Sequence, residues 1–272
     1  MPKFSLAALT VLELAPPELI DVAATCGYDH VGIRLLPAVA GGPAYPLMDD
    51  LAKLKETLAR LDATGVTVAD LEVVAFRPET EVGAFSAFFE TGAQLGAKHM
   101  LVAGYDPDLS RFTDRFAAFC AAAAPYGLTA DLEFMPWTSV PDLRTANGIV
   151  AQTGQPNAGV LVDVLHFDRS NSLVGELARV PADRLHYWQI YDGPAEKPAT
   201  TEEMMHAARH ERMFPGEGGI DLVTLVRTMP KDIPISIEVP TAELAKTMSA
   251  EARARRALVT ARKIMAAAGV AA

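Results

Sequence analysis

Short apolar segments alternate with amphipathic helical segments along the chain, and the alternation repeats eight times. The helical segments carry apolar residues at helical spacing, and several end at glycine, as residues 49–65 do. Strands that alternate with helices predict βαβ units with parallel strands. Eight such units can close on themselves, so we expect an α/β fold with a single (β/α)8 TIM barrel. The expected strands lie within residues 3–12, 30–37, 66–76, 99–105, 129–136, 159–167, 185–193 and 234–240.

Four of the expected strands carry an oxygen-bearing side chain near the carboxyl end. These side chains are Glu133 in TADLEF, Asp163 in GVLVDVLHF, Gln189 in LHYWQIYDG and Glu238 in PISIEVP. The carboxyl ends of the strands of a parallel barrel meet at one face, where such folds build their sites. One acid at a strand end is often only a structural hydrogen-bond acceptor. Four on consecutive strands predict convergence on one point.

This donor set predicts a metal ion. Glu133, Asp163 and Glu238 supply three carboxylates, and Gln189 supplies a neutral amide oxygen. Three carboxylates in one pocket repel one another and raise their own pKa values unless a cation lies between them. Hard oxygen ligands suit Mg2+ or Mn2+ better than Zn2+ or Co2+. We therefore expect one divalent cation held by these four residues.

Length and composition exclude several classes of protein. The 272 residues match the usual length of one barrel, so residues 1–272 are expected to form one domain. No run of 18 apolar residues occurs, and the N-terminus lacks a signal-peptide layout, so we expect a cytoplasmic protein with no membrane partner. Cys26 and Cys120 are expected to be reduced packing residues. The net charge of −10, without a basic stripe outside the C-terminal helix, argues against nucleic acid as a partner.

The chain resembles the xylose-isomerase-like barrels, which include ketose 3-epimerases, hydroxypyruvate isomerase, and inosose and 3-dehydroshikimate dehydratases. The resemblance covers nearly the whole chain. It rests on Glu133 in DLEF, on the DxxH of Asp163 and His166, on the QxxD that starts at Gln189, on RHERMFPGEG, and on Glu238 in SIEVP. It implies that the matching positions bind one divalent cation. The third ligand is often His in that family. Gln189 stands at that position here, and in this respect the chain resembles the dehydroshikimate dehydratases.

As chemistry, the expected site fits proton abstraction beside a carbonyl. A divalent cation chelated by a carbonyl oxygen and a neighbouring oxygen stabilises an enediolate. Glu133 and Glu238 would face the substrate from opposite sides, so one can remove a proton and the other can return one. The resemblance implies the same catalytic pair. The expected function is therefore a metal-dependent sugar isomerase or epimerase, and the alternative is a lyase that dehydrates a 3-dehydroshikimate-like or inosose-like substrate.

Four further residues are expected to bind substrate. His166 lies three residues beyond Asp163, and the resemblance places it beside the metal as a donor. Arg212, in ERMFPGEG, could bind an anionic or hydroxyl-rich substrate, or form a surface ion pair with a neighbouring glutamate. Arg34 closes the second strand, and Trp137 offers an apolar wall for a carbohydrate or packs in the core.

The long connection from 194 to 219 is expected to be a lid that carries Arg212, because long connections in compact domains are commonly lids. His30, His99 and His186 start or precede strands, at the end of the barrel associated with stability, and have no expected catalytic role. The expected partner is a small polyol, keto-sugar or cyclic keto-acid. The sequence is compatible with a homo-oligomer and does not define the oligomeric state.

Two other classes of function fit less well. A nuclease of the same superfamily would need more histidines for a trinuclear zinc centre and a basic groove, and the sequence has neither. A catalytically silent sugar-binding protein would not need two facing glutamates. Both alternatives are disfavoured on these grounds.

Overall fold

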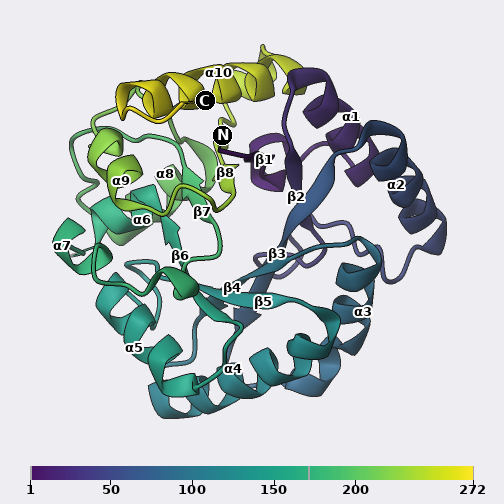
Figure 1. Ribbon diagram of the computed structural model, residues 1–272, viewed down its shortest axis with the longest axis vertical. Helices are drawn as coiled ribbons and strands as arrows, with labels where there is room; N and C mark the ends of the chain where they lie inside the picture. Colours follow the sequence, from purple (N-terminus) through teal and green to yellow (C-terminus); the bar gives the residue numbers. More distant parts are fainter. Residues whose placement is uncertain (1, 171, 272) are drawn as a thin grey trace.

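The computed structural model describes residues 2–170 and 172–271, and within them eight parallel strands close into a barrel in sequence order. The expected (β/α)8 barrel is confirmed, with the strands at the centre of the molecule (Figure 1). The strands are β1 (Phe4–Leu6), β2 (His30–Arg34), β3 (Thr67–Phe76), β4 (His99–Gly104), β5 (Thr129–Glu133), β6 (Ala158–Asp163), β7 (Trp188–Ile190) and β8 (Ile235–Ile237).

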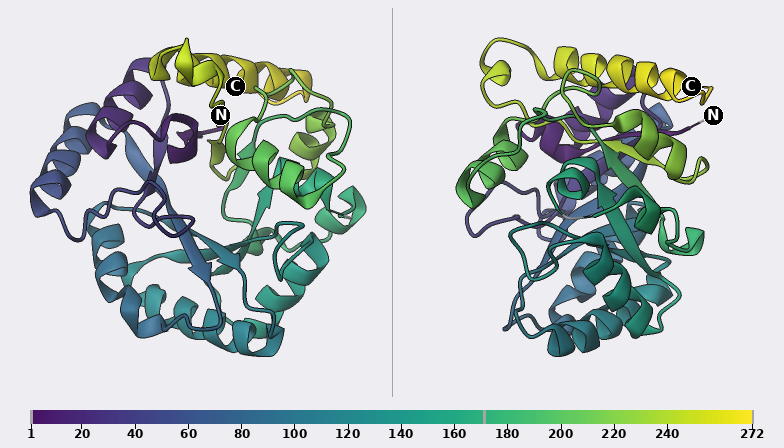
Figure 2. Two further views of the ribbon diagram at one scale, coloured as in Figure 1. Left: turned by 180° about the vertical axis from the view of Figure 1, so that it is seen from behind. Right: turned by 90° about the vertical axis from the view of Figure 1, so that its left-hand side faces the viewer.

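Helices surround the barrel as a ring, and the two chain ends lie close together beside the last helix (Figures 1 and 2). The α-helices are α1 (Pro16–Cys26), α2 (Leu51–Thr64), α3 (Ser86–Gln94), α4 (Leu109–Ala123), α5 (Leu143–Thr153), α6 (Val164–Arg169), α7 (Val174–Leu177), α8 (Thr201–His210), α9 (Leu222–Thr228) and α10 (Ala250–Ala267). Short 3-10 helices are η1 (Ala8–Val11), η2 (Val82–Phe85), η3 (Ala124–Tyr126), η4 (Ala182–Arg184) and η5 (Leu244–Lys246). No helix within the described residues is both long and apolar enough to cross a bilayer.

Local sequence fixes the ends of several helices. Asp50, Asp108 and Asp142 each accept a backbone N–H bond of 2.9–3.1 Å at the start of α2, α4 and α5. Each such cap stabilises its helix by about 1 kcal/mol. Helices α1 and α2 end at Gly27 and Gly65, whose φ angles of 86° and 73° suit a residue without a Cβ atom.

Strand side chains alternate between two cores. The outer core lies between the sheet and the helices, and there Phe76 packs edge-on against Phe112 and Phe119 with ring centroids 5.7 and 5.3 Å apart. On β5, Leu132 belongs to this outer core. A smaller cluster is formed by the alternate strand positions and comprises Val73, Leu101, Ala103, Met135, Leu161 and Tyr187. Glu133 shares the inner face of β5 with this cluster, so strand alternation directs it into the mouth of the barrel.

Two expected segments differ from the structure. Residues 3–12 contain only a three-residue strand, β1, because the chain turns into η1 after Ala7. The threonine within η1 explains the turn: the Thr10 hydroxyl donates to the Ile237 carbonyl and accepts from the Val239 N–H, which ties the segment to the end of β8. The expected strand within 159–167 ends at Asp163, and the residues after it begin α6. Helix α8 lies at the centre of the connection from 194 to 219.

Candidate metal and substrate site

The four expected metal ligands all lie at the carboxyl end of the barrel. Glu133 ends β5, Asp163 ends β6, and Glu238 directly follows β8. Gln189 lies in β7, in register with Asp163 on one side and Ser236 on the other. All four side chains are buried. Glu133, Asp163 and His166 each offer a ligand atom, and these atoms lie within 4.8 Å of one another.

Asp163 is held by donors from three directions. It caps α6, so its Oδ1 accepts the His166 backbone N–H at 2.9 Å. The same oxygen accepts the Tyr191 hydroxyl, and Oδ2 lies 3.3 Å from Nη1 of Arg212. These contacts fix the orientation of the Asp163 carboxylate.

Arg212 is a buried part of the site and not a surface ion-pairing residue. Its Nη1 donates to Glu238 Oε2 at 2.5 Å and to the Glu238 carbonyl at 3.2 Å, while Nε donates to the Ala208 carbonyl at 2.6 Å. Its guanidinium carbon lies 4.0 Å from the centroid of the Tyr191 ring. One face of the cation is therefore covered by an aromatic ring, and its edge meets two carboxylates.

The two glutamates differ from ordinary surface carboxylates. Burial raises the pKa of Glu133 well above its usual value, and the charges of Asp163 and Glu238 add to that effect. Burial also raises the pKa of Glu238, to about 7, although the neighbouring Arg212 opposes the shift. A carboxyl group with the pKa of Glu238 can accept or release a proton near neutral pH.

Gln189 provides a direct test of whether the pocket suits a metal ion. Its side chain is fully buried, yet neither Oε1 nor Nε2 has a hydrogen-bond partner among the described residues. An unpaired buried amide costs roughly 1–3 kcal/mol. A cation beside Asp163 would take the amide oxygen of Gln189 as a ligand. It would also offset the negative charge of the three carboxylates, which Arg212 balances only in part. The residues therefore fit an oxygen-ligated divalent cation.

His166 lies beside two of the metal-ligand candidates, Glu133 and Asp163, and lines the cavity at this end of the barrel. Its Nε2 is 3.7 Å from Glu133 Oε1, and burial lowers its pKa to about 4, so the ring is neutral at pH 7. Trp137 meets the His166 ring edge-on, with centroids 5.0 Å apart. Both side chains line the same cavity.

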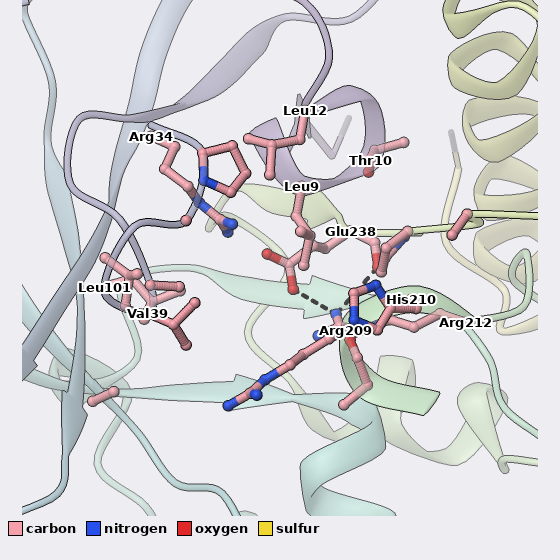
Figure 3. A pocket seen from close by; sticks show the side chains of 18 of the residues that line it. Leu9, Thr10, Leu12, Arg34, Val39, Leu101, Arg209, His210, Arg212 and Glu238 are labelled. Atoms are coloured by element: carbon pink, nitrogen blue, oxygen red, sulfur yellow. Dashed lines mark hydrogen bonds and ion pairs between the residues drawn. The ribbon is translucent and has the colours of Figure 1, made fainter. Parts of the chain in front are cut away.

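The cavity at this end of the barrel has a volume of 390 Å³, a size suited to a small molecule. Glu133, Glu238 and Arg212 line it together with apolar side chains such as Leu9 and Leu101. In Figure 3 the labelled residues of α8 lie across the pocket from Arg34. Arg34 forms two hydrogen bonds, of 3.0 and 2.5 Å, with the buried Glu72 carboxylate, so this cation is already paired.

The comparisons with known proteins agree with this architecture. A family model described as Xylose isomerase-like TIM barrel matches residues 20–264. The chain belongs to this family.

Two curated relatives show how this xylose isomerase-like barrel compares with other proteins. It is 31% identical over 104 residues to a 3-dehydroshikimate dehydratase of Pseudomonas aeruginosa, a match that covers 37% of this chain and 15% of the relative. It is 28% identical over 145 residues to an inosose isomerase of Bacillus subtilis, covering 52% of this chain and 49% of the relative. The matches thus span less than half of each curated relative.

A solved structure of an IolI protein with a bound zinc atom superposes on this xylose isomerase-like barrel with a TM-score of 0.79. The alignment covers 97% of this chain and 98% of the other at 21% identity, so this likeness concerns the fold.

Sequence reasoning missed Tyr191 and Glu72. Tyr191 holds Asp163 and lies against Arg212, and Glu72 fixes Arg34. Tyr191 had a usable signal: it is two residues beyond Gln189, so strand alternation places both side chains on the same face. Asp192 accepts N–H bonds from Gly193, Gly216 and Ile220, which orders the chain after β7.

Proposed function

We propose that this protein is a divalent-metal-dependent isomerase or epimerase that moves a proton beside the carbonyl of a small polyhydroxylated substrate. The observation that carries the proposal is the pair Glu133 and Glu238. Both line one cavity, both are buried, and both have raised pKa values. Membership of the xylose isomerase-like family and the relatives with isomerase and dehydratase names support an enzyme of this kind.

Glu133, Asp163, Gln189 and Glu238 are the proposed metal ligands. Their three carboxylates and one amide favour Mn2+ or Mg2+. Such an ion, when bound, would polarise the carbonyl oxygen of the substrate and stabilise negative charge that develops there.

The two glutamates are the proposed acid and base. They project into the cavity from β5 and from the end of β8, which are separated in the barrel by β6 and β7. A substrate between them presents one face of its acidic carbon to Glu133 and the other to Glu238. One glutamate takes the proton, and the other delivers a proton from the opposite side, which inverts the carbon. Delivery of the proton instead to the neighbouring former carbonyl carbon, with a proton moved between the two oxygens of the enediol, would give isomerisation.

Other side chains orient the substrate. The Arg212 guanidinium, whose orientation is fixed by Ala208 and Glu238, is placed to donate to a substrate oxygen in the cavity. Neutral His166 donates or accepts one hydrogen bond beside Glu133. Trp137 supplies an apolar wall for the carbon skeleton.

Helix α8 is the proposed lid. Ala208, Arg209 and His210, at its carboxyl end, line the cavity, and the following residues return to the barrel through the bridge from Glu211 to Thr241. Movement of α8 would open the cavity, withdraw Arg209 and break the hydrogen bond from Arg212 to the Ala208 carbonyl. Closure would remove water from the proton-transfer site, which strengthens the interactions of Arg212 with the substrate.

Proton exchange with solvent tests the proposal. The Mn2+-loaded protein would be incubated in D2O with ketoses, inososes and 3-dehydroshikimate, and deuterium incorporation would be followed by NMR. We expect uptake at the carbon beside the carbonyl of a ketose or inosose, without loss of water. Deuterium uptake coupled to elimination would make the protein a dehydratase, and the absence of exchange on the whole panel would contradict both assignments.

A further inference from the structure

A second group of metal-ligating side chains lies at the amino-terminal end of the barrel. His99 begins β4, Asp131 lies in β5, and His186 lies two residues before β7. Nδ1 of His186 is 2.6 Å from Asp131 Oδ1, and Nδ1 of His99 is 3.9 Å from Asp131 Oδ2. One ligand atom from each of the three residues falls within 4.8 Å of the others.

The surrounding residues hold this group in place. The two imidazole rings are parallel within 2°, with centroids 6.0 Å apart, and the ring of Tyr187 stacks on His99 at 5.1 Å. Thr129 donates to Asp131 Oδ2 at 2.6 Å and lies 2.9 Å from His99 Nδ1. The imidazoles are thus fixed at both sides of one carboxylate.

A glycine on the neighbouring strand makes the approach possible. A Cβ atom at Gly159 would lie 2.2 Å from Asp131 Oδ1 and 2.5 Å from His186 Nδ1. Any other residue there would push the carboxylate and the imidazole apart. The closeness of this pair therefore depends on a specific feature of β6.

From this arrangement we propose that His99, Asp131 and His186 form a Zn2+ site, separate from the site at the carboxyl end. Zinc–ligand distances of about 2.0–2.2 Å place tetrahedral ligand atoms roughly 3.3 Å apart. Nδ1 of His186 and Nδ1 of His99 lie 2.6 and 3.9 Å from different oxygens of the Asp131 carboxylate, and one ligand atom from each residue already lies within 4.8 Å of the others. Rotation of the carboxylate and a shift of the two rings toward each other would bring these atoms to the zinc separation.

Charge and ligand type distinguish the two ends of the barrel. Two imidazole nitrogens and one carboxylate suit Zn2+, whereas the oxygen donors at the other end suit Mn2+ or Mg2+. Asp131 is completely buried, and Asp70, in register with His99, adds a second buried carboxylate whose oxygens have no partner among the described residues. The side chains of His99 and His186 are 13% and 16% exposed, so an ion can enter from solvent and retain a water ligand.

Bound zinc would join β4, β5 and the segment before β7 at the bottom of the barrel. Strand β7 has only three residues, so few backbone hydrogen bonds hold this segment. The three ligands lie together only in the folded protein, so Zn2+ would bind the folded state and not the unfolded chain. Bound Zn2+ should therefore raise the melting temperature.

Imidazole 15N NMR on the full chain tests the site without any substitution. On titration with Zn2+, the Nδ1 resonances of His99 and His186 should shift together and saturate at one equivalent for this site. Resonances of these two residues that stay unchanged while others respond would overturn the proposal. This readout does not depend on binding or catalysis at the carboxyl end.

Variants then assign the ligands by zinc content after gel filtration. His99→Gln and His186→Gln should each lose one equivalent of zinc relative to wild type. Two controls should keep it: His30→Gln, at the same end of the barrel and bonded to Thr67, and His206→Gln, which breaks the histidine pair on α8. Unchanged zinc content in both ligand variants, or equal loss in the controls, would refute the site. If a ligand variant does not fold, the wild-type titration decides alone.

Discussion

Nη1 of Arg212 lies 2.5 Å from Oε2 of Glu238, and both side chains are almost completely buried. The same guanidinium nitrogen is 3.3 Å from Asp163. Arg212 therefore contacts two carboxylates that are also proposed metal ligands, and it offsets part of their charge. A bound metal ion would contact the same two carboxylates as Arg212. Metal binding would therefore affect the position of the Arg212 guanidinium.

Substitution of Arg212 should impair catalysis more than metal binding. Arg212→Ala should lower kcat/KM by roughly a hundredfold or more, the scale for loss of one preorganised donor. Arg212→Lys should restore only part of the activity, because Lys lacks the planar fork that reaches Glu238 and Ala208 together. Steady-state kinetics and metal analysis on the same samples measure both effects. Near-normal kcat/KM in the Ala variant would remove Arg212 from the catalytic site.

Gln189 should be distinguishable as a ligand by two substitutions. Gln189→Leu leaves the metal one ligand short, so we expect much weaker Mn2+ affinity in a calorimetric titration. Gln189→His should retain binding, because a neutral imidazole can fill the same coordination position. Equal affinity of the Leu variant and wild type would show that the amide is not a ligand.

Metal affinity should depend on pH through Glu238. Its pKa in the metal-free protein is about 7, and only the carboxylate can bind a cation, so metal displaces a proton at lower pH. Apparent Mn2+ affinity should increase as the pH rises through about 7 and then level off. In the metal-free protein, protonated Glu238 stabilises the folded state. This contribution is complete below pH 4.5, the usual pKa of a glutamate, and is lost as the pH rises through about 7, the pKa of Glu238 in the folded protein.

Glu238→Gln is the matched control for this titration. It should bind metal more weakly, and its affinity should depend less on pH near neutrality. If the Mn2+ affinity of the wild-type protein stayed constant as the pH rises through about 7, the raised pKa of Glu238 would not control metal binding.

Tyr191→Phe should destabilise the protein without emptying the space beneath Arg212. The variant keeps the ring that the guanidinium covers and removes only the hydroxyl bonded to Asp163. A hydrogen bond to a charged group contributes roughly 1.5–3 kcal/mol, which urea denaturation of the metal-free protein would detect. Tyr45→Phe, which removes a half-buried hydroxyl bonded to the Leu12 carbonyl, is a control for loss of a hydroxyl alone. Equal stability of Tyr191→Phe and wild type would show that the hydroxyl does not support Asp163.

The barrel was predictable because each βα unit has a local pattern. Apolar strands, aspartate caps such as Asp142 and terminal glycines such as Gly65 repeat along the sequence, and closure follows from their number. The start of the chain was less predictable. Residues of η1 are as apolar as a strand, and only the long-range bonds of Thr10 to β8 explain why they coil.

The candidate site was predictable in position but not in its contacts. Strand-end placement brings Glu133, Asp163 and Glu238 to one mouth, since parallel strands share a direction. The pairing of Arg212 with two of these carboxylates depends on how α8 returns to the barrel, which no local pattern encodes. Likewise, the approach of His186 to Asp131 needs the packing across Gly159.

The most direct test of the central claim is face-specific proton exchange in two variants. With an epimer pair identified from the D2O panel, exchange at the acidic carbon would be measured for Glu133→Gln and Glu238→Gln. Gln keeps an oxygen ligand, and metal content would be matched before comparison. We predict that each variant loses epimerisation but still exchanges the proton of one epimer, a different epimer in each case. Exchange of both epimers at wild-type rates in either variant would contradict the assignment of Glu133 and Glu238 as the two bases.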